Sequence, residues 1–102
     1  MYRFAICDDN PADIDYIETL TREWNRTAGY RIEIERFPSG EAFLFAFEED
    51  QSYDVLFLDI EMKDLSGIDL AQKLRQLGSR IQIIFVTGYM DYIAQGYDGG
   101  AS

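Results

Sequence analysis

The sequence predicts an α/β protein in which a parallel sheet is covered by helices on both faces. Short apolar runs of strand length alternate with longer segments whose apolar residues recur at helical spacing, in the order β-α-β-α-β-α-β-α. The links between these segments are short, and no internal repeat is present. Strict alternation of this kind favours parallel strands joined by right-handed crossovers. We therefore expect one domain built as a three-layer α/β/α sandwich.

The first predicted strand is Tyr2–Cys7, which becomes continuously apolar towards its end. Asn10 is typical of a helix N-cap, and Pro11 is typical of the first helical position. Gly29 is expected to end the helix that follows. The residues expected on its inward stripe are Ile14, Ile17, Leu20 and Trp24.

The second predicted strand, Arg31–Phe37, alternates polar and apolar residues, which is typical of a half-exposed strand at the edge of a sheet. Pro38 and Gly40 turn the chain, and Ser39 is the expected N-cap of the second helix. Residues 48–52 are expected to form a solvated loop. The inward stripe of this second helix is predicted to be Ala42, Phe43, Ala46 and Phe47.

The third strand is predicted from the apolar run 55–58, which indicates burial on both faces and stops abruptly at Asp59. A third helix is expected to start at Ser66 or Gly67 and to stop at Gly78. Ile81–Thr87 is the fourth strand, and 89–97 is a short fourth helix. The third helix is expected to turn Ile68, Ala71, Leu74 and Leu77 towards the sheet.

Composition restricts the chemistry that the chain can perform. Of its 102 residues, 19 are acidic and 9 basic, a net charge of −10 that argues against direct binding of this domain to a nucleic-acid backbone. There is no histidine, which excludes His-based zinc sites and Ser-His-Asp triads within the chain. The single cysteine, Cys7, lies in an apolar run and is expected to be a buried, unreactive thiol. No apolar run is long enough to span a membrane, so we expect a cytoplasmic protein without membrane contact.

Acidic residues follow two of the predicted strands. Asp8 and Asp9 come directly after the first strand, and Asp59 ends the third. If these strands are neighbours, the three carboxylates meet at the carboxyl edge of the sheet, where α/β proteins bind ligands. Oxygen ligands without His or Cys favour a hard ion, and a small, incomplete carboxylate set favours Mg²⁺. With Mg²⁺ bound, Asp59 is the candidate nucleophile towards a phosphoryl group, and the Thr87 hydroxyl is a candidate contact for its oxygens.

Each of these residues also has a purely structural interpretation. Asp8 and Asp9 could simply favour the positive end of the first helix, and Asp59 could cap a turn. Thr87 could be an ordinary β-branched residue at a strand end. Their joint placement at strand ends makes the functional interpretation the stronger one.

At this point the sequence resembles the receiver domain of two-component response regulators. The resemblance rests on Asp8-Asp9, on Asp59 with Met62 and Gly67 downstream, and on the segment 85–87. The amino-acid sequence of three segments is most similar to that of receivers attached to LytTR-type DNA-binding domains. These segments are residues 58–62, 66–71 and 86–92.

The resemblance implies a flavodoxin-like fold with strand order 2-1-3-4. It also implies that Asp59 accepts a phosphoryl group from a sensor histidine kinase. Asp8, Asp9, Asp59 and the backbone carbonyl of Glu61 would bind Mg²⁺, and Thr87 would contact the phosphate and switch on activation. Such a domain is a phospho-acceptor with self-phosphorylation and autodephosphorylation chemistry only, and its output would be transcriptional.

The chain departs from the family pattern in two places. Lys63 stands where the family commonly has proline, and the lysine that ends the family's fifth strand has no counterpart here, nor has the fifth helix. We therefore expect a receiver over residues 2–98, truncated at its C-terminal side, with 99–102 as a flexible tail that resembles a linker more than a packed element. We also expect weak Mg²⁺ binding, impaired or absent phosphoryl-transfer signalling, and self-association through the fourth strand and fourth helix.

Other functional classes remain open at this stage. A Mg²⁺-dependent phosphohydrolase with an aspartate nucleophile would need a second Asp where Glu61 stands. A nucleotide-binding half-domain lacks support because neither glycine-rich phosphate motif is present. The serious alternative is a receiver-like module that is not phosphorylated and acts through interaction or dimerisation alone.

Overall fold

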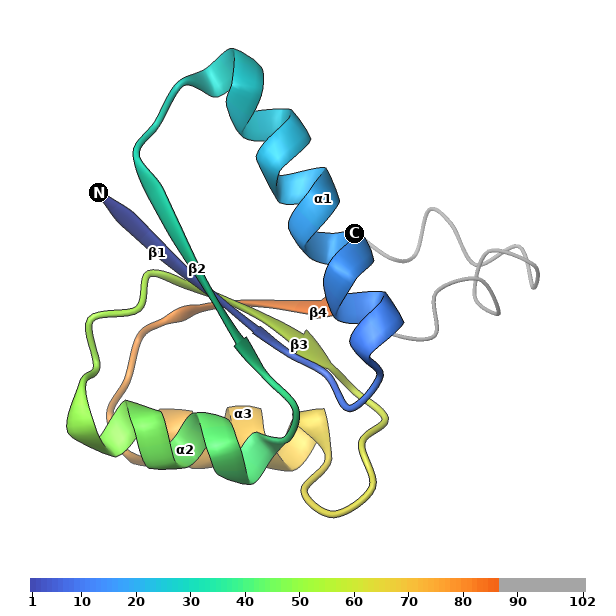
Figure 1. Cartoon of the computed structure of the whole chain (residues 1–102). Helices are drawn as coiled ribbons and strands as arrows, with labels where there is room; N and C mark the ends of the chain where they lie inside the picture. The colour runs from blue at the N-terminus through green and yellow to red at the C-terminus, as the bar shows by residue number, and fades with distance from the viewer. Residues whose placement is uncertain (87–102) are drawn as a thin grey trace, which may run out of the picture.

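The fold was analysed in a computed structural model of the chain, which describes residues 1–86. Four strands and three helices alternate along these residues (Figure 1). The strands are β1 (Tyr2–Cys7), β2 (Ile32–Phe37), β3 (Val55–Asp59) and β4 (Gln82–Val86). The helices are α1 (Pro11–Ala28), α2 (Gly40–Glu49) and α3 (Gly67–Gln76).

The strands form one parallel sheet in the order β2-β1-β3-β4, which confirms the predicted fold class and strand order. Helix α1 lies on one face of the sheet, and α2 and α3 lie on the other (Figure 1). The predicted fourth helix and Thr87 lie outside the described residues. The receiver boundaries 2–98 and the tail 99–102 stay predictions.

The helices begin where capping residues satisfy their first amide groups. The side chain of Asn10 accepts a hydrogen bond from the Ala12 amide, and Ser39 and Ser66 cap α2 and α3 in the same way. Helix α1 ends at Gly29, whose φ of 74° is the left-handed conformation that glycine adopts without strain. These boundaries agree with the sequence expectation, except that α2 extends to Glu49 into the predicted loop.

The larger core lies between the sheet and the pair α2–α3. Alternate strand residues enter it from β1 and β3, and aromatic side chains of α2 fill its centre, with the Phe37 and Phe43 rings 5.3 Å apart edge to face. Cys7 is fully buried in this core, as predicted. Its fully buried members also include Ala5, Leu56, Leu58, Phe43, Leu70 and Leu74.

The face covered by α1 is packed more openly than the sequence predicts. Ile14 and Ile17 are buried against Ile6, but Leu20 and Trp24 are half exposed, and the buried position in the next turn is Thr21. The Thr21 hydroxyl donates to the Ile17 carbonyl at 2.8 Å, so its burial leaves no unpaired donor. The predicted inward stripe was therefore wrong at its C-terminal half.

Two further expectations about side-chain orientation were wrong. In α3 the buried residues are Gly67, Leu70 and Leu74, whereas Ile68 and Leu77 are exposed. In β3 the residues on one face are buried but Val55 and Phe57 on the other are only partly buried, because they lie beside α1 where its cover is incomplete. The continuous apolar run therefore overstated burial.

Candidate functional site at the carboxyl edge of the sheet

The strand register brings two acidic residues together at the centre of the sheet. Cys7 of β1 pairs with Leu58 of β3, so the next residues, Asp8 and Asp59, leave the two strands side by side. Asp9 follows in the turn to α1. One carboxylate oxygen from each of the three lies within 4.8 Å of the others.

The two central carboxyl groups are nearly inaccessible to solvent. Asp8 is 2% exposed and Asp59 7%, whereas Asp9 is exposed. The Asn10 amide donates to Asp8 at 2.9 Å, and the Glu61 amide donates to Asp59 at 3.3 Å. No Lys or Arg among residues 1–86 forms an ion pair with any of the three. Their charge is therefore not balanced by the described protein groups.

The electrostatic cost of this arrangement appears as raised pKa values. Burial raises the pKa of Asp59 to about 7, and the neighbouring charge of Asp8 adds to the effect. Burial also raises the pKa of Asp8, although its hydrogen bond from the Asn10 amide opposes the rise. The hydrogen bond between the two carboxyl groups raises the pKa of Asp59 and lowers that of Asp8. Burial and the charge of Asp8 therefore both favour the protonated form of Asp59.

The position of Asp59 depends on Gly67, at the first residue of α3. A Cβ atom at position 67 would lie 2.1 Å from the Asp59 carbonyl oxygen and 2.8 Å from the Ile60 Cα. The Gly67 amide donates to the Ile60 carbonyl at 2.9 Å, which closes the loop from residue 60 to 66 onto the end of β3. The close approach of backbone to backbone requires glycine here.

The carboxylate set fits a hard divalent cation. All three side chains offer oxygen atoms, two of them accept hydrogen bonds from backbone amides, and no Lys or Arg within residues 1–86 forms an ion pair with the cluster. Mg²⁺ prefers a few carboxylates and retains several waters, for which the exposed side of Asp9 leaves room. The structure does not test the Glu61 carbonyl as a ligand, and Thr87 lies outside the described residues.

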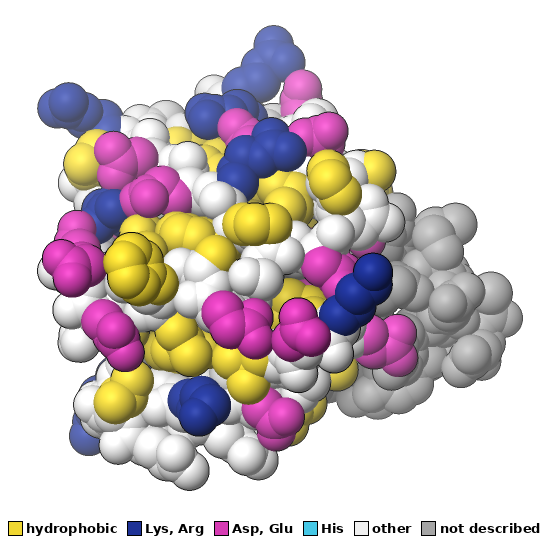
Figure 2. All heavy atoms as spheres, turned by 60° about the horizontal axis from the view of Figure 1, so that its bottom comes forward, with side chains coloured by type: hydrophobic (Ala, Val, Ile, Leu, Met, Phe, Trp, Pro, Cys, Tyr) yellow, Lys and Arg dark blue, Asp and Glu magenta, His cyan; other side chains and the backbone are white. Residues whose placement is uncertain are grey.

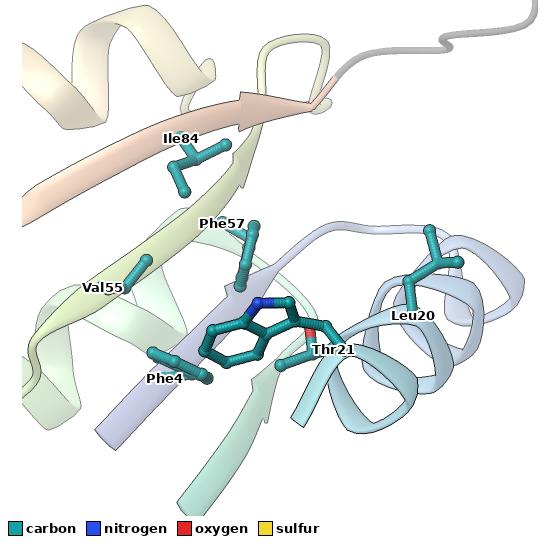
Figure 3. A pocket seen from close by; sticks show the side chains of 7 residues that line it. Phe4, Leu20, Thr21, Val55, Phe57 and Ile84 are labelled. Atoms are coloured by element: carbon teal, nitrogen blue, oxygen red, sulfur yellow. The ribbon is translucent and has the colours of Figure 1, made fainter. Parts of the chain in front are cut away.

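A second concave feature lies between α1 and the strands β1, β3 and β4. Figure 3 shows side chains of α1 (Leu20 and Thr21), β3 (Val55 and Phe57) and β4 (Ile84) around this apolar groove. An adjoining hollow extends it along α1 to Asp13 and to Val86 at the end of β4. Each part has a volume of about 330–340 Å³. Sequence reasoning missed the groove because it assigned Leu20 and Trp24 to the core.

Comparison with known proteins identifies the family. Residues 4–102 match the family model of the response regulator receiver domain. Because this match covers nearly the whole chain, the protein belongs to the response regulator receiver family. The predicted family is thereby confirmed, and receiver domains are signalling domains rather than classical enzymes.

Two curated relatives illustrate the range of similarity. The chain is 33% identical over 101 residues to the transcriptional regulatory protein RprY of Bacteroides fragilis, covering 97% of this chain and 40% of that protein. It is 43% identical over 58 residues to the sensory transduction protein LytT of Enterococcus faecalis, covering 55% of this chain and 24% of that protein. The chain therefore spans less than half the length of these curated relatives.

One solved relative was determined in complex with Mg²⁺-BeF. The response regulator TrrA of Thermotoga maritima, solved in complex with Mg²⁺-BeF, is 31% identical with a TM-score of 0.67. The match covers all of this chain and 83% of that one. Receiver domains bind Mg²⁺ at an acidic pocket, and this chain contains an acidic group formed by Asp8, Asp9 and Asp59. Among residues 1–86, no helix is sufficiently long and apolar to cross a bilayer.

Proposed function

We propose that Asp59 accepts a phosphoryl group from a phosphohistidine on a sensor histidine kinase, in a Mg²⁺-dependent reaction. The observation that carries this proposal is the convergence of Asp8, Asp9 and Asp59 at the carboxyl edge of the sheet, where no basic side chain in the described part of the chain pairs with them. Asp59 is the acceptor because it ends the central strand β3 and is fixed there by the Gly67 contact. Asp8 and Asp9 hold the metal, with the Glu61 carbonyl as a further ligand.

The chemistry assigned to Asp59 is a nucleophilic substitution at phosphorus. An oxygen of its carboxylate forms the new O–P bond as the P–N bond to the donor imidazole breaks, and that electron pair returns to the imidazole nitrogen. A bound Mg²⁺ supplies charge neutralisation for the phosphoryl oxygens. A pKa of about 7 means that about half of the metal-free molecules hold a proton on Asp59 at neutral pH, and this proton must leave before attack. The Thr87 hydroxyl contacts the transferred group.

The whole protein is proposed to control transcription. Relatives described as LytT and as a transcriptional regulatory protein support this output, and the present chain covers only part of their length. A DNA-binding domain of LytTR type would carry the response, in the cytoplasm. The acidic receiver itself does not bind DNA in this proposal, and Figure 2 shows acidic side chains spread over the face that it displays.

Intact mass spectrometry after incubation with acetyl phosphate and Mg²⁺ tests the acceptor role. We expect a phosphoryl adduct that requires Mg²⁺ and is absent from Asp59→Asn, formed slowly and at low occupancy. Glu61→Gln is the matched control, because it removes a neighbouring carboxylate but keeps the backbone carbonyl. An adduct that persists in Asp59→Asn, or the absence of any adduct in the natural sequence, would contradict the proposal.

A second candidate function is self-association, which is favoured by the apolar groove and by the exposed strand β4. Ile84 and Phe85 of β4 are 42% and 43% exposed, and β4 pairs only with β3 among the described strands. An exposed apolar strand of this kind is a template for pairing with another chain. We infer self-association through β4, and light scattering that shows a clean monomer at micromolar concentration would contradict it. If Asp59→Asn keeps every partner interaction, a module acting without phosphorylation is the better description.

A further inference from the structure

The loop between β3 and α3 is anchored on both sides of a short exposed tip. Met62 packs against the larger core, with its Sδ atom 3.8 Å from the buried Cys7 Sγ. Leu65 also packs against this core and contacts the start of α2, where a Cβ at Gly40 would lie 3.1 Å from the Leu65 Cδ2. Between these anchors the two tip residues, 63 and 64, are exposed. The loop therefore presents its tip from a fixed base.

Lys63 at this tip shares a hollow with the acidic site. The hollow, of about 210 Å³, lies between the loop and the start of α2, and Asp9 is part of its lining. Its other polar or charged side chains are Ser39, Glu41, Lys63 and Asp64. Among the described residues of this lining, Lys63 is the one basic side chain, against three carboxylates.

The Lys63 ammonium is not neutralised by these carboxylates. Among the ion pairs of residues 1–86 there is none that involves Lys63, although Asp9, Glu41 and Asp64 line the same hollow. Exposed charges within about 10 Å of each other still interact at physiological salt, and more strongly at low salt. A free ammonium beside an anionic site opposes the binding of a metal cation and attracts an approaching anion.

We propose that Lys63 is a steering residue for the phosphodonor, drawing the donor's negatively charged phosphoryl group into the hollow beside Asp9. This inference rests on the proposed function of Asp59. The positive charge of Lys63 affects the two ligands of the site in opposite directions. It weakens the binding of Mg²⁺ and accelerates the arrival of an anionic donor. Its contribution is a charge effect on the free site, so Lys63 is not placed among the groups that touch the reacting atoms.

The experiment compares Lys63→Gln and Lys63→Glu with the natural sequence. Lys73→Gln is the matched control, since it removes the same charge from an exposed position in the last turn of α3. Mg²⁺ affinity is measured by calorimetry without a phosphodonor. The initial rate of Asp59 labelling is then measured with acetyl phosphate and with the less highly charged phosphoramidate, at low and high salt.

We expect Lys63→Gln to slow labelling by acetyl phosphate about threefold at low salt and to tighten Mg²⁺ binding about twofold. Lys63→Glu should exceed both effects, phosphoramidate should respond less, and high salt should remove the differences. If Lys63→Gln matches Lys73→Gln in both assays, the steering role is overturned. If the natural sequence shows no Asp59 labelling with either donor, the proposed function fails. In that case an unchanged Mg²⁺ affinity in both Lys63 variants overturns the charge effect as well.

Discussion

Replacing Gly67 by alanine should destabilise the protein and disturb the candidate site at the same time. The added methyl carbon would lie 2.1 Å from the Asp59 carbonyl oxygen, far inside van der Waals contact, and this oxygen belongs to the backbone. Relief requires α3 and the end of β3 to move apart. That movement also lengthens the 2.9 Å hydrogen bond from the Gly67 amide to the Ile60 carbonyl.

The expected cost combines two contributions. Overpacking of a buried position costs about 1–3 kcal/mol, and loss of a hydrogen bond costs about 1 kcal/mol. We therefore expect Gly67→Ala to lower the free energy of unfolding by about 2–4 kcal/mol, a large fraction of the stability of a domain of this size. Because the displaced segment carries Asp59, Mg²⁺ affinity should fall together with stability.

Urea unfolding measures this effect, with fluorescence of the single tryptophan, Trp24, as the probe. Gly40→Ala is the control, because the added carbon meets only the Leu65 side chain, at 3.1 Å, and a side chain can shift by a few tenths of an ångström. A Gly67→Ala variant as stable as the Gly40→Ala variant would refute the assignment of a tight backbone contact at position 67.

Three further predictions concern charge and packing. Because the folded-state pKa of Asp59 lies near 7 and its ordinary value is 3.8, the folded protein binds more protons in this interval, so stability should fall as pH rises from about 4 to 7. Chemical denaturation across this range should show the fall, and Asp59→Asn should flatten it; a slope unchanged in Asp59→Asn would count against the raised pKa. Phe43→Ala removes a fully buried ring and should lower the free energy of unfolding in urea by about 3–5 kcal/mol. Phe45→Ala, at a side chain 73% exposed, should lower it by under about 0.5 kcal/mol. Similar losses of stability in the two variants would contradict the core assignment. Arg3→Met removes hydrogen-bonded ion pairs to Glu33 and Asp50, at 2.8 and 2.7 Å. The free energy of unfolding should fall by about 1 kcal/mol, and by less at high salt. A loss of stability that does not change with salt would show that packing is the cause.

Much of the fold follows from local sequence rules. The caps at Asn10, Ser39 and Ser66 and the stop at Gly29 are encoded by side chains that satisfy or release backbone groups locally. The edge position of β2 follows from its alternating pattern, which leaves one face polar. These features were predictable because they depend on residues close together in the chain.

Burial of individual helix residues was less predictable. Leu20 and Trp24 continue the apolar spacing of Ile14 and Ile17, yet they flank the groove instead of entering the core. Spacing identifies an apolar stripe, but the tilt of α1 over the sheet decides how much of that stripe is covered. Ile68 in α3 shows the same limit, since Leu70, two residues further along the helix, takes the buried position.

The candidate site was partly accessible from sequence. Asp8, Asp9 and Asp59 could be selected because they follow strands, and the register then places them together. The contribution of Gly67 to the geometry required coordinates, because a backbone contact of this kind leaves no signal in spacing beyond the glycine itself. The anchored tip at Lys63 likewise depends on how Met62 and Leu65 pack.

The central claim, that Asp8, Asp9 and Asp59 act together as one site for a hard cation, is tested most directly by Mg²⁺ titration in a calorimeter. We expect one weak site, with affinity at least about tenfold lower in Asp9→Asn and retained in Glu61→Gln, whose backbone carbonyl is unchanged. Asp9 is the informative position because it is exposed, so its substitution leaves the buried pair and the fold in place. Equal Mg²⁺ affinity in Asp9→Asn and the natural sequence would contradict the account.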